Sequence, residues 1–148
     1  ADVMAEAHRL YDVQKASIGP QGLVQPAHIL LRLSQKASAK EQEAAKARID
    51  SIYGVLQNGG DFEQLAKDFS QDPGTAKRGG LLPWIAVNQT LKEFEEVAFS
   101  LQTGEMSKPF LSPAGYHIIL MKGRKQLEPF DTVLNDILKF IERRNIRE

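Results

Sequence analysis

The fold is decided by residues 24–33, which read VQPAHILLRL, and by their counterpart at 116–122, which reads YHIILMK. Each segment is a short aliphatic run with one histidine embedded in it, His28 in the first and His117 in the second. Runs of this length, rich in Ile, Leu and Val and bounded by turn residues, are typical of buried β-strands. We therefore predict two central strands, and their pairing would bring the two histidines together.

The sequence around these strands predicts the rest of a small sheet. Residues 110–111 predict a brief strand and residues 112–115 a turn, so that 110–122 forms a hairpin. Residues 81–85, which read LLPWI, predict a further short strand. Proline lacks the N–H that a central strand needs, so Pro83 favours the edge of the sheet.

Helical periodicity predicts three helices inside the chain. The first begins at Ser38, where Glu41 completes a capping-box pattern, and it ends at the glycines of residues 58–60. Asp61 predicts the N-cap of the second helix. The third carries apolar side chains at helical spacing across residues 91–101.

One more amphipathic helix is predicted at each end of the chain, near residues 2–16 and 129–144. A small antiparallel sheet with helices packed on it belongs to the α+β class. We divide the chain into an N-terminal flanking helix and linker at 1–23, a central domain at 24–124 and a C-terminal flanking helix at 125–148. The flanking helices are expected to pack against each other or against a larger protein of which this chain is a part.

Composition excludes several classes of function. The 19 basic and 19 acidic side chains among 148 residues give a net charge of zero, which argues against a nucleic-acid-binding protein. The absence of cysteine excludes disulfides, thiolate nucleophiles and cysteine-based zinc sites. No apolar run approaches the roughly 18 residues of a membrane span, and residues 1–23 lack the apolar core of a signal peptide.

The two histidines are the first candidates for chemistry. A single histidine on a core strand is more often a structural residue whose hydrogen bonds are satisfied. A pair can donate and accept through each other, which fixes their tautomers and creates a polar floor beneath an apolar site. A metal site is less favoured, because His8, the third histidine, falls on a separate predicted helix.

Two other features could contribute to a site. Residues 70–80, SQDPGTAKRGG, combine a carboxylate with turn-forming residues, and a simple capped turn would also explain them. The aromatic side chains Trp84, Phe94 and Phe99 could line a pocket, although aromatics at helical spacing are more often core residues.

Six motifs together resemble the parvulin family of peptidyl-prolyl isomerases over about a hundred residues, 24–123. In chain order they are HIL at 28–30, GDFEQLA at 60–66, SQDP at 70–73 with Gly79-Gly80, EFEEVAF at 93–99, TGEMS at 103–107 and GYHII at 115–119. Each motif is common by itself, but the six in this order are specific.

The resemblance implies a four-stranded antiparallel sheet wrapped by helices and the isomerisation of X-Pro bonds without a cofactor or metal. It implies site roles for His28, His117, Asp72 and Ser112. The cysteine or carboxylate of the family matches Asp72, so a covalent mechanism is not expected. The pocket for the proline ring matches the side chains of Leu82, Thr90, Phe94 and Phe99.

Three departures from the family pattern bear on activity. The usual GGDLGW string reads GGLLPW at 79–84, and Thr90 replaces the methionine of the pocket. The arginine cluster that recognises phosphate in some members has no counterpart beyond Lys36 and Lys40, so phosphate-specific recognition is not expected.

These departures leave two functions open. The domain is either an isomerase that assists the folding of proline-containing polypeptides or a weakly catalytic chaperone module that binds unfolded chains. A purely structural domain is the least favoured alternative. Similar domains of the bacterial cell envelope sit between helical chaperone segments, so the resemblance implies an envelope or periplasmic location.

Overall fold

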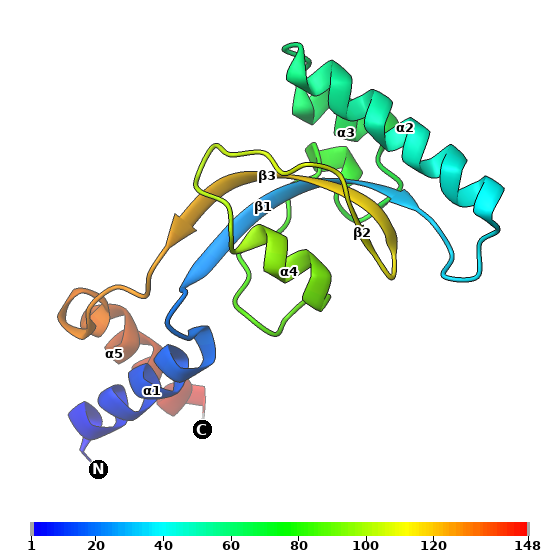
Figure 1. Cartoon of the computed structure of the whole chain (residues 1–148). Coiled ribbons are helices and arrows are strands. Elements are labelled where there is room, and N and C mark those ends of the chain that lie inside the picture. Colours follow the sequence, from blue (N-terminus) through cyan, green and yellow to red (C-terminus); the bar gives the residue numbers. More distant parts are fainter. Residues whose placement is uncertain (1, 148) are drawn as a thin grey trace.

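The computed structural model describes residues 2–147. Its helices and strands follow one another as α1 (Val3–Ile18), β1 (Leu23–Arg32), α2 (Ala39–Gln57), α3 (Phe62–Phe69), the 3-10 turn η1 (Ala76–Arg78), α4 (Lys92–Ala98), β2 (Phe110–Ser112), β3 (Gly115–Lys125) and α5 (Phe130–Arg147). The predicted α+β class is therefore confirmed, and Figure 1 shows the long β1 and β3 strands running through the centre of the molecule.

The sheet of the described residues has three strands in the order β1-β3-β2, all antiparallel. β1 and β3 pair along their full lengths, from Leu23 opposite Lys125 to Arg32 opposite Gly115, with one irregularity at Gln25 and Pro26. β2 and β3 form the predicted hairpin.

The expected fourth strand at residues 81–85 is not confirmed, because the sheet of the described residues has three strands. The segment lies along the outer edge of β1, but it pairs through two isolated bridges, Leu81 with Ala27 and Ile85 with Val24. The N–H of Leu82 donates to the carbonyl of Pro26 at 2.9 Å, but Pro26 has no N–H to return the bond, so the ladder is interrupted there.

The loop that follows α3 covers the rest of this outer edge of β1. The N–H of Gln71 donates to the carbonyl of Leu30 at 2.7 Å, and the N–H of His28 donates to the carbonyl of Gly80 at 2.9 Å. An exposed strand edge is a template for unwanted pairing, and this loop removes it. The same contacts attach the 70–80 loop to the strand that carries His28.

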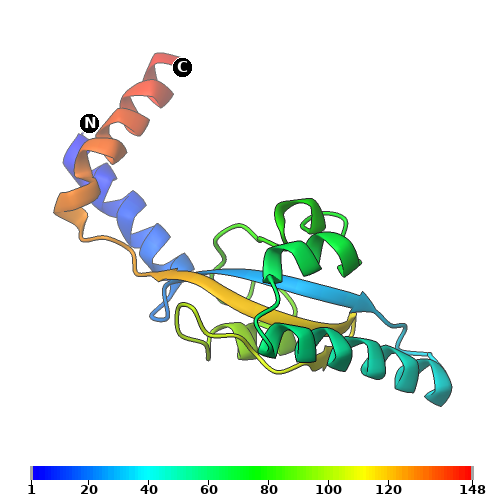
Figure 2. The ribbon, with the colours of Figure 1, turned by 90° about the horizontal axis from the view of Figure 1, so that it is seen from above.

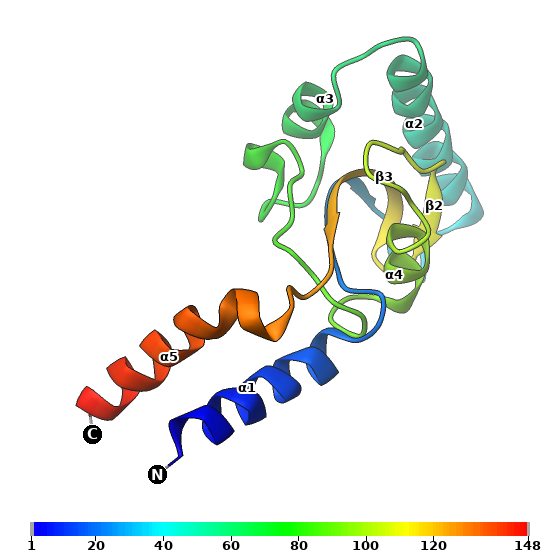
Figure 3. The same ribbon diagram turned by 90° about the vertical axis from the view of Figure 1, so that its left-hand side faces the viewer.

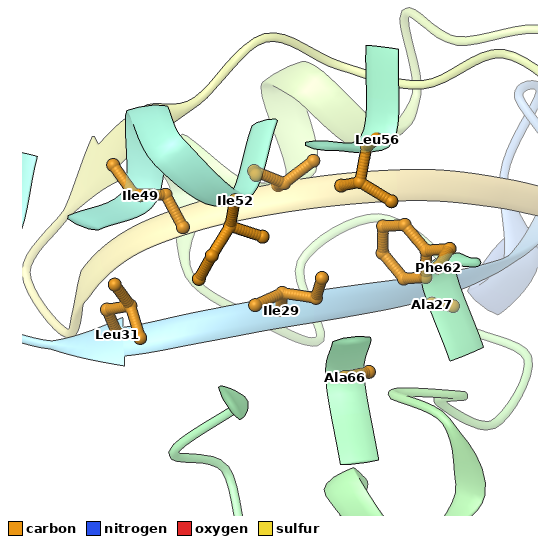
Figure 4. Packing of buried hydrophobic residues seen from close by; sticks show 9 residues of the cluster. Ala27, Ile29, Leu31, Ile49, Ile52, Leu56, Phe62 and Ala66 are labelled. Carbon is orange, nitrogen blue, oxygen red and sulfur yellow. The ribbon is translucent and has the colours of Figure 1, made fainter. Parts of the chain in front are cut away.

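Alternation along the strands divides the core into two layers. Ile29, Leu31 and Ile118 point toward α2 and α3, where they pack with Ile49, Ile52 and other aliphatic side chains (Figure 4). The opposite layer contains Val24, Ile119 and Met121 beneath α4, with the aromatic side chains of Phe94 and Phe99. Figure 1 shows α2 and α3 on one side of the sheet and α4 on the other, and Figure 2 shows β1 and β3 running side by side.

The two terminal helices lie side by side at one end of the sheet (Figure 3). The imidazole of His8 stacks on the ring of Phe130 with a centroid separation of 3.9 Å. Tyr11 contacts the same ring edge-on, and its hydroxyl donates to the carbonyl of Glu128 at 2.7 Å. Arg144 pairs with Glu6 at 2.9 Å.

The flanking helices therefore pack against each other, which was one of the two expected arrangements. The division into 1–23, 24–124 and 125–148 stays a prediction. Among the described residues, no helix combines the length and apolar character required to span a membrane.

Gly80 is the residue on which the covering of β1 depends most directly. Its φ is +86°, and a Cβ at this position would collide with the carbonyl oxygen of His28. We expect Gly80→Ala to lower the free energy of unfolding by about 2 kcal/mol, because the loop must move away from the strand.

Gly54→Ala is the matched control, because Gly54 lies in α2 with open space around it. This change should raise stability by roughly 0.5–1 kcal/mol. Urea unfolding of both variants measures the difference, and a stable Gly80→Ala protein would contradict the close approach.

Candidate active site

Four of the predicted site residues form one continuous chain of hydrogen bonds. Nε2 of His28 lies 2.7 Å from Oδ2 of Asp72, and Nδ1 of His28 lies 3.2 Å from Nδ1 of His117. Nε2 of His117 lies 2.6 Å from Oγ of Ser112. The side chains of His28, His117 and Ser112 are buried, whereas that of Asp72 is 25% exposed at the end of the chain.

The chemistry of the partners determines where the protons lie. An ionised carboxylate only accepts, so Nε2 of His28 donates to Asp72 and Nδ1 of the neutral ring accepts. His117 must then donate from Nδ1 and accept at Nε2 from the hydroxyl of Ser112. The N–H of Ala114 donates to that hydroxyl oxygen at 3.0 Å, so both ends of the chain are satisfied.

Burial lowers the pKa of both histidines and so favours the neutral form of each ring. It lowers the pKa of His117 to about 3, and the nearby His28 contributes to that shift. Burial also lowers the pKa of His28, against the opposing effect of Asp72. Burial of Asp72 would raise its pKa, but hydrogen bonds from His28, Thr75 and the Gly74 backbone outweigh it and lower the pKa.

The strand register explains why the two rings meet. His28 lies opposite Ile119 and His117 lies opposite Leu30, so the histidines are diagonal neighbours on adjacent strands. Diagonal pairs on one face come within reach of ring side chains. Their ring centroids are 5.4 Å apart.

Asp72 is held in place by its own turn. Its Oδ1 accepts from the N–H of Gly74 at 3.2 Å, and its Oδ2 accepts from the hydroxyl of Thr75 at 2.7 Å. Thr75 is buried and was not among the predicted site residues. Its signal in the sequence is the short Asp-to-Thr spacing typical of side-chain turns.

Aromatic rings cover the histidines on the side of α4. Phe94 contacts both imidazoles edge-on at centroid distances of 5.5 Å. Phe110 stacks on His117 at 5.1 Å and was missed in the sequence, where it was assigned only to the hairpin. Leu82 and Phe99 belong to the same apolar cluster as Phe94, so these three predicted pocket residues come together.

Thr90 lies in a different environment from the other predicted pocket residues. Its N–H and its hydroxyl both donate to Oε2 of Glu95, at 2.6 and 3.0 Å. The Glu95 carboxylate also accepts from the N–H groups of Asn88 and Gln89. The role of Thr90 in a proline pocket stays a prediction.

Glu95 is a positioning residue that the sequence did not reveal. It is 9% exposed, follows Phe94 in the first turn of α4 and closes the loop that contains Asn88, whose φ is +67°. Burial would raise the Glu95 pKa, but the hydrogen bonds from residues 88–90 outweigh it and lower the pKa. The start of α4 carries no N-cap motif in the sequence, because its N-cap residue Leu91 makes no side-chain hydrogen bond. The sequence therefore does not mark this contact.

No group of three or more His, Cys, Asp or Glu side chains among residues 2–147 has an arrangement that could hold a metal ion. His8, the third histidine, stacks on Phe130 in the terminal helix pair.

An antiparallel sheet with helices on both faces carries the Asp-His-His-Ser hydrogen-bond chain beside aromatic rings, and this part of the chain matches the rotamase class of domains. Residues 28–123 match the family model described as the PPIC-type PPIase domain. The chain belongs to this family of parvulin-type peptidyl-prolyl cis/trans isomerases.

Comparisons with known proteins agree. The chain is 39% identical over 109 residues to Foldase protein PrsA 3 of Bacillus anthracis, a match that covers 74% of this chain and 37% of that protein. A crystal structure of PrsA from Bacillus anthracis matches with 32% identity and a TM-score of 0.63, over 96% of this chain and 59% of the other.

A third match is a Campylobacter jejuni structure from the pair PEB4 and the periplasmic protein Cj1289, two structurally related SurA-like chaperones. It shows 28% identity and a TM-score of 0.57, over 97% of this chain and 56% of that chain. The present chain thus spans only part of the length of these relatives.

The buried neutral histidines should make stability depend on pH. Below the ordinary histidine pKa of 6.5, the unfolded chain binds protons that the folded chain excludes. The free energy of unfolding should therefore fall by up to about 1.4 kcal/mol per pH unit for each histidine as the pH drops toward the folded pKa. Urea unfolding at about pH 7 and about pH 5 measures this slope.

His117→Gln should reduce the slope, because it removes one of the two buried groups. An equally steep loss of stability in that variant would contradict the assignment of His117 as a neutral buried ring.

Glu95→Gln should lower the free energy of unfolding by about 1–3 kcal/mol at neutral pH, because an amide cannot accept all four hydrogen bonds. The contribution of Glu95 is present above its ordinary pKa of 4.5 and is lost as the pH falls through the lower folded value. Glu96→Gln, an exposed neighbour on α4, should stay within about 0.5 kcal/mol of the parent. Equal effects in both variants, measured by urea unfolding, would argue against a stabilising role for the hydrogen bonds from residues 88–90 to Glu95.

Proposed function

We propose that this domain isomerises X-Pro bonds of unfolded or partly folded polypeptides at the site formed by Asp72, His28, His117 and Ser112. The observation that carries the proposal is the hydrogen-bond chain of these residues, which runs from buried Ser112 to partly exposed Asp72, with Phe94 packed on both imidazoles. Polar groups at fixed positions beside an apolar wall are what a rotating prolyl amide needs.

Rotation about the X-Pro bond requires no transfer of atoms. The barrier is about 20 kcal/mol, because amide resonance must be lost when the bond twists. A catalyst therefore needs to bind the twisted amide better than the planar one. Leu82, Phe94 and Phe99 would hold the proline ring and exclude water from the carbonyl of the preceding residue, which belongs to the rotating amide.

The histidines act as positioning residues in this proposal. Both are buried and neutral, and each ring nitrogen already has a hydrogen-bond partner. They have no proton available for the substrate, so their contribution is to fix Asp72 and the polar floor of the pocket. Asp72 is partly exposed and presents its carboxylate at the boundary where the amide would lie.

The wider role proposed for the parent protein is assistance in folding polypeptide clients. Relatives of this chain carry the names foldase and chaperone, and one is described as periplasmic. We propose a bacterial cell-envelope location by the same comparison. Only Lys36 and Lys40 are found where some family members have an arginine cluster for phosphate. Clients are therefore expected to be recognised without phosphorylation.

Exchange spectroscopy on a series of X-Pro peptides tests the isomerase function. Asp72→Ala and Phe94→Leu should each lower kcat/KM by about tenfold or more, because each removes a group that would contact the twisting amide. His117→Gln should lower kcat with little change in KM, since it acts through its neighbours. Glu96→Gln, which lies on the same helix outside the site, is the control.

An aggregation-suppression assay on the same variants separates the chaperone alternative. Turnover near background in the parent, with suppression surviving both Asp72→Ala and Phe94→Leu, would replace the isomerase proposal with a binding function.

A further inference from the structure

A cavity adjoins the hydrogen-bond chain at Ser112. It has a volume of about 350 Å³ and lies between the end of β1, the β2–β3 hairpin and the start of α4. Sites for small groups are typically concave and of about this size or larger, with few polar groups that fix orientation. This cavity is large enough for one long side chain.

The cavity lies next to the proposed site. Ser112 lines it and also hydrogen-bonds to Nε2 of His117 at 2.6 Å. Glu93 lines it and precedes Phe94, whose ring packs on both histidines. A client proline bound beside Phe94 would place a neighbouring client residue near this cavity.

The lining combines aliphatic side chains with the neutral polar side chains of Ser34, Gln35, Gln42 and Ser112, and it carries a single charge. Leu33, Leu111 and Pro113 supply aliphatic surface. Glu93 is the one charged residue among those that line the cavity, and it is partly buried. Lysine and arginine bury an aliphatic stem while the charged end binds a carboxylate, and this lining matches that chemistry.

We propose that this cavity is a subsite for a lysine or arginine side chain next to the client proline, with Glu93 as its partner. The inference rests on the proposed isomerase function. An acidic or phosphorylated side chain at the same position would meet the Glu93 carboxylate and would be rejected by charge repulsion. The subsite thus selects cationic over anionic sequences around proline.

Two peptide series test the subsite, with Lys, Arg, Gln or Glu placed directly before or directly after the proline. We expect kcat/KM for Lys and Arg to exceed that for Glu by about fivefold in one of the series, as for a partly exposed ion pair. The ratio should shrink at high ionic strength, because salt screens the pair.

Substitutions of Glu93 identify the carboxylate responsible. Glu93→Gln should bring the Lys to Glu ratio to within about twofold of one, and Glu93→Lys should invert it. Glu96→Gln is the matched control, because it removes a negative charge from α4 outside this cavity. It should leave the ratio as in the parent.

Equal kcat/KM for Lys and Glu peptides in both series would overturn the proposal, as would a preference that survives Glu93→Gln. NMR titration gives the affinities of the same peptides, so the subsite is tested even if no peptide is isomerised. Absence of turnover with a charge preference in binding would reject the isomerase function alone.

Discussion

The antiparallel register between β1 and β3 is the constraint on which the rest of the structure depends. It places His28 and His117 diagonally on the face beneath α4, close enough for a hydrogen bond between their Nδ1 atoms. The alternate residues Ile29 and Ile118 then face α2 and α3 and build the other core layer. A slip of one residue would turn one histidine to the opposite layer, so the core and the site are set by the same pairing.

The outer edge of β1 links this pairing to the carboxylate. The strand must satisfy its backbone groups, and it does so with the loop that begins at Ser70, whose hydroxyl accepts from the N–H of Leu30 at 3.1 Å. Gln71 continues the contact, and Asp72 follows it to reach His28. Backbone hydrogen bonding thus positions Asp72. On the other side of the site α4 carries Phe94, and the hydrogen bonds of Glu95 hold this helix to residues 88–90.

Several parts of this arrangement follow from sequence patterns because they are local. The Ser38 and Glu41 capping box and the 110–122 hairpin are confirmed, since both depend on residues close together in the chain. The juxtaposition of His28, Asp72, His117 and Ser112 was reached through ordered motifs that resemble a known family. The fourth strand expected at residues 81–85 is not confirmed, because strand propensity in LLPWI does not show that the opposing Pro26 has no N–H to return the bond from Leu82. Phe110 and Glu95 were missed because their contacts depend on how loops and helices close in space, whereas the Thr75 contact with Asp72 is local and its spacing is visible in the sequence.

The sequence by itself determined the α+β class, the two histidine-bearing strands and the family, because apolar periodicity, turn residues and ordered motifs are written along the chain. Only the tertiary structure decided the direction of the hydrogen bonds from Asp72 to Ser112, the neutral state of the histidines and the cavity beside Glu93. Those properties arise from burial and from distances between residues far apart in the chain, such as the 2.7 Å between His28 and Asp72. Local pattern specifies the elements, whereas their packing creates the low-dielectric surroundings that set the charge of the site.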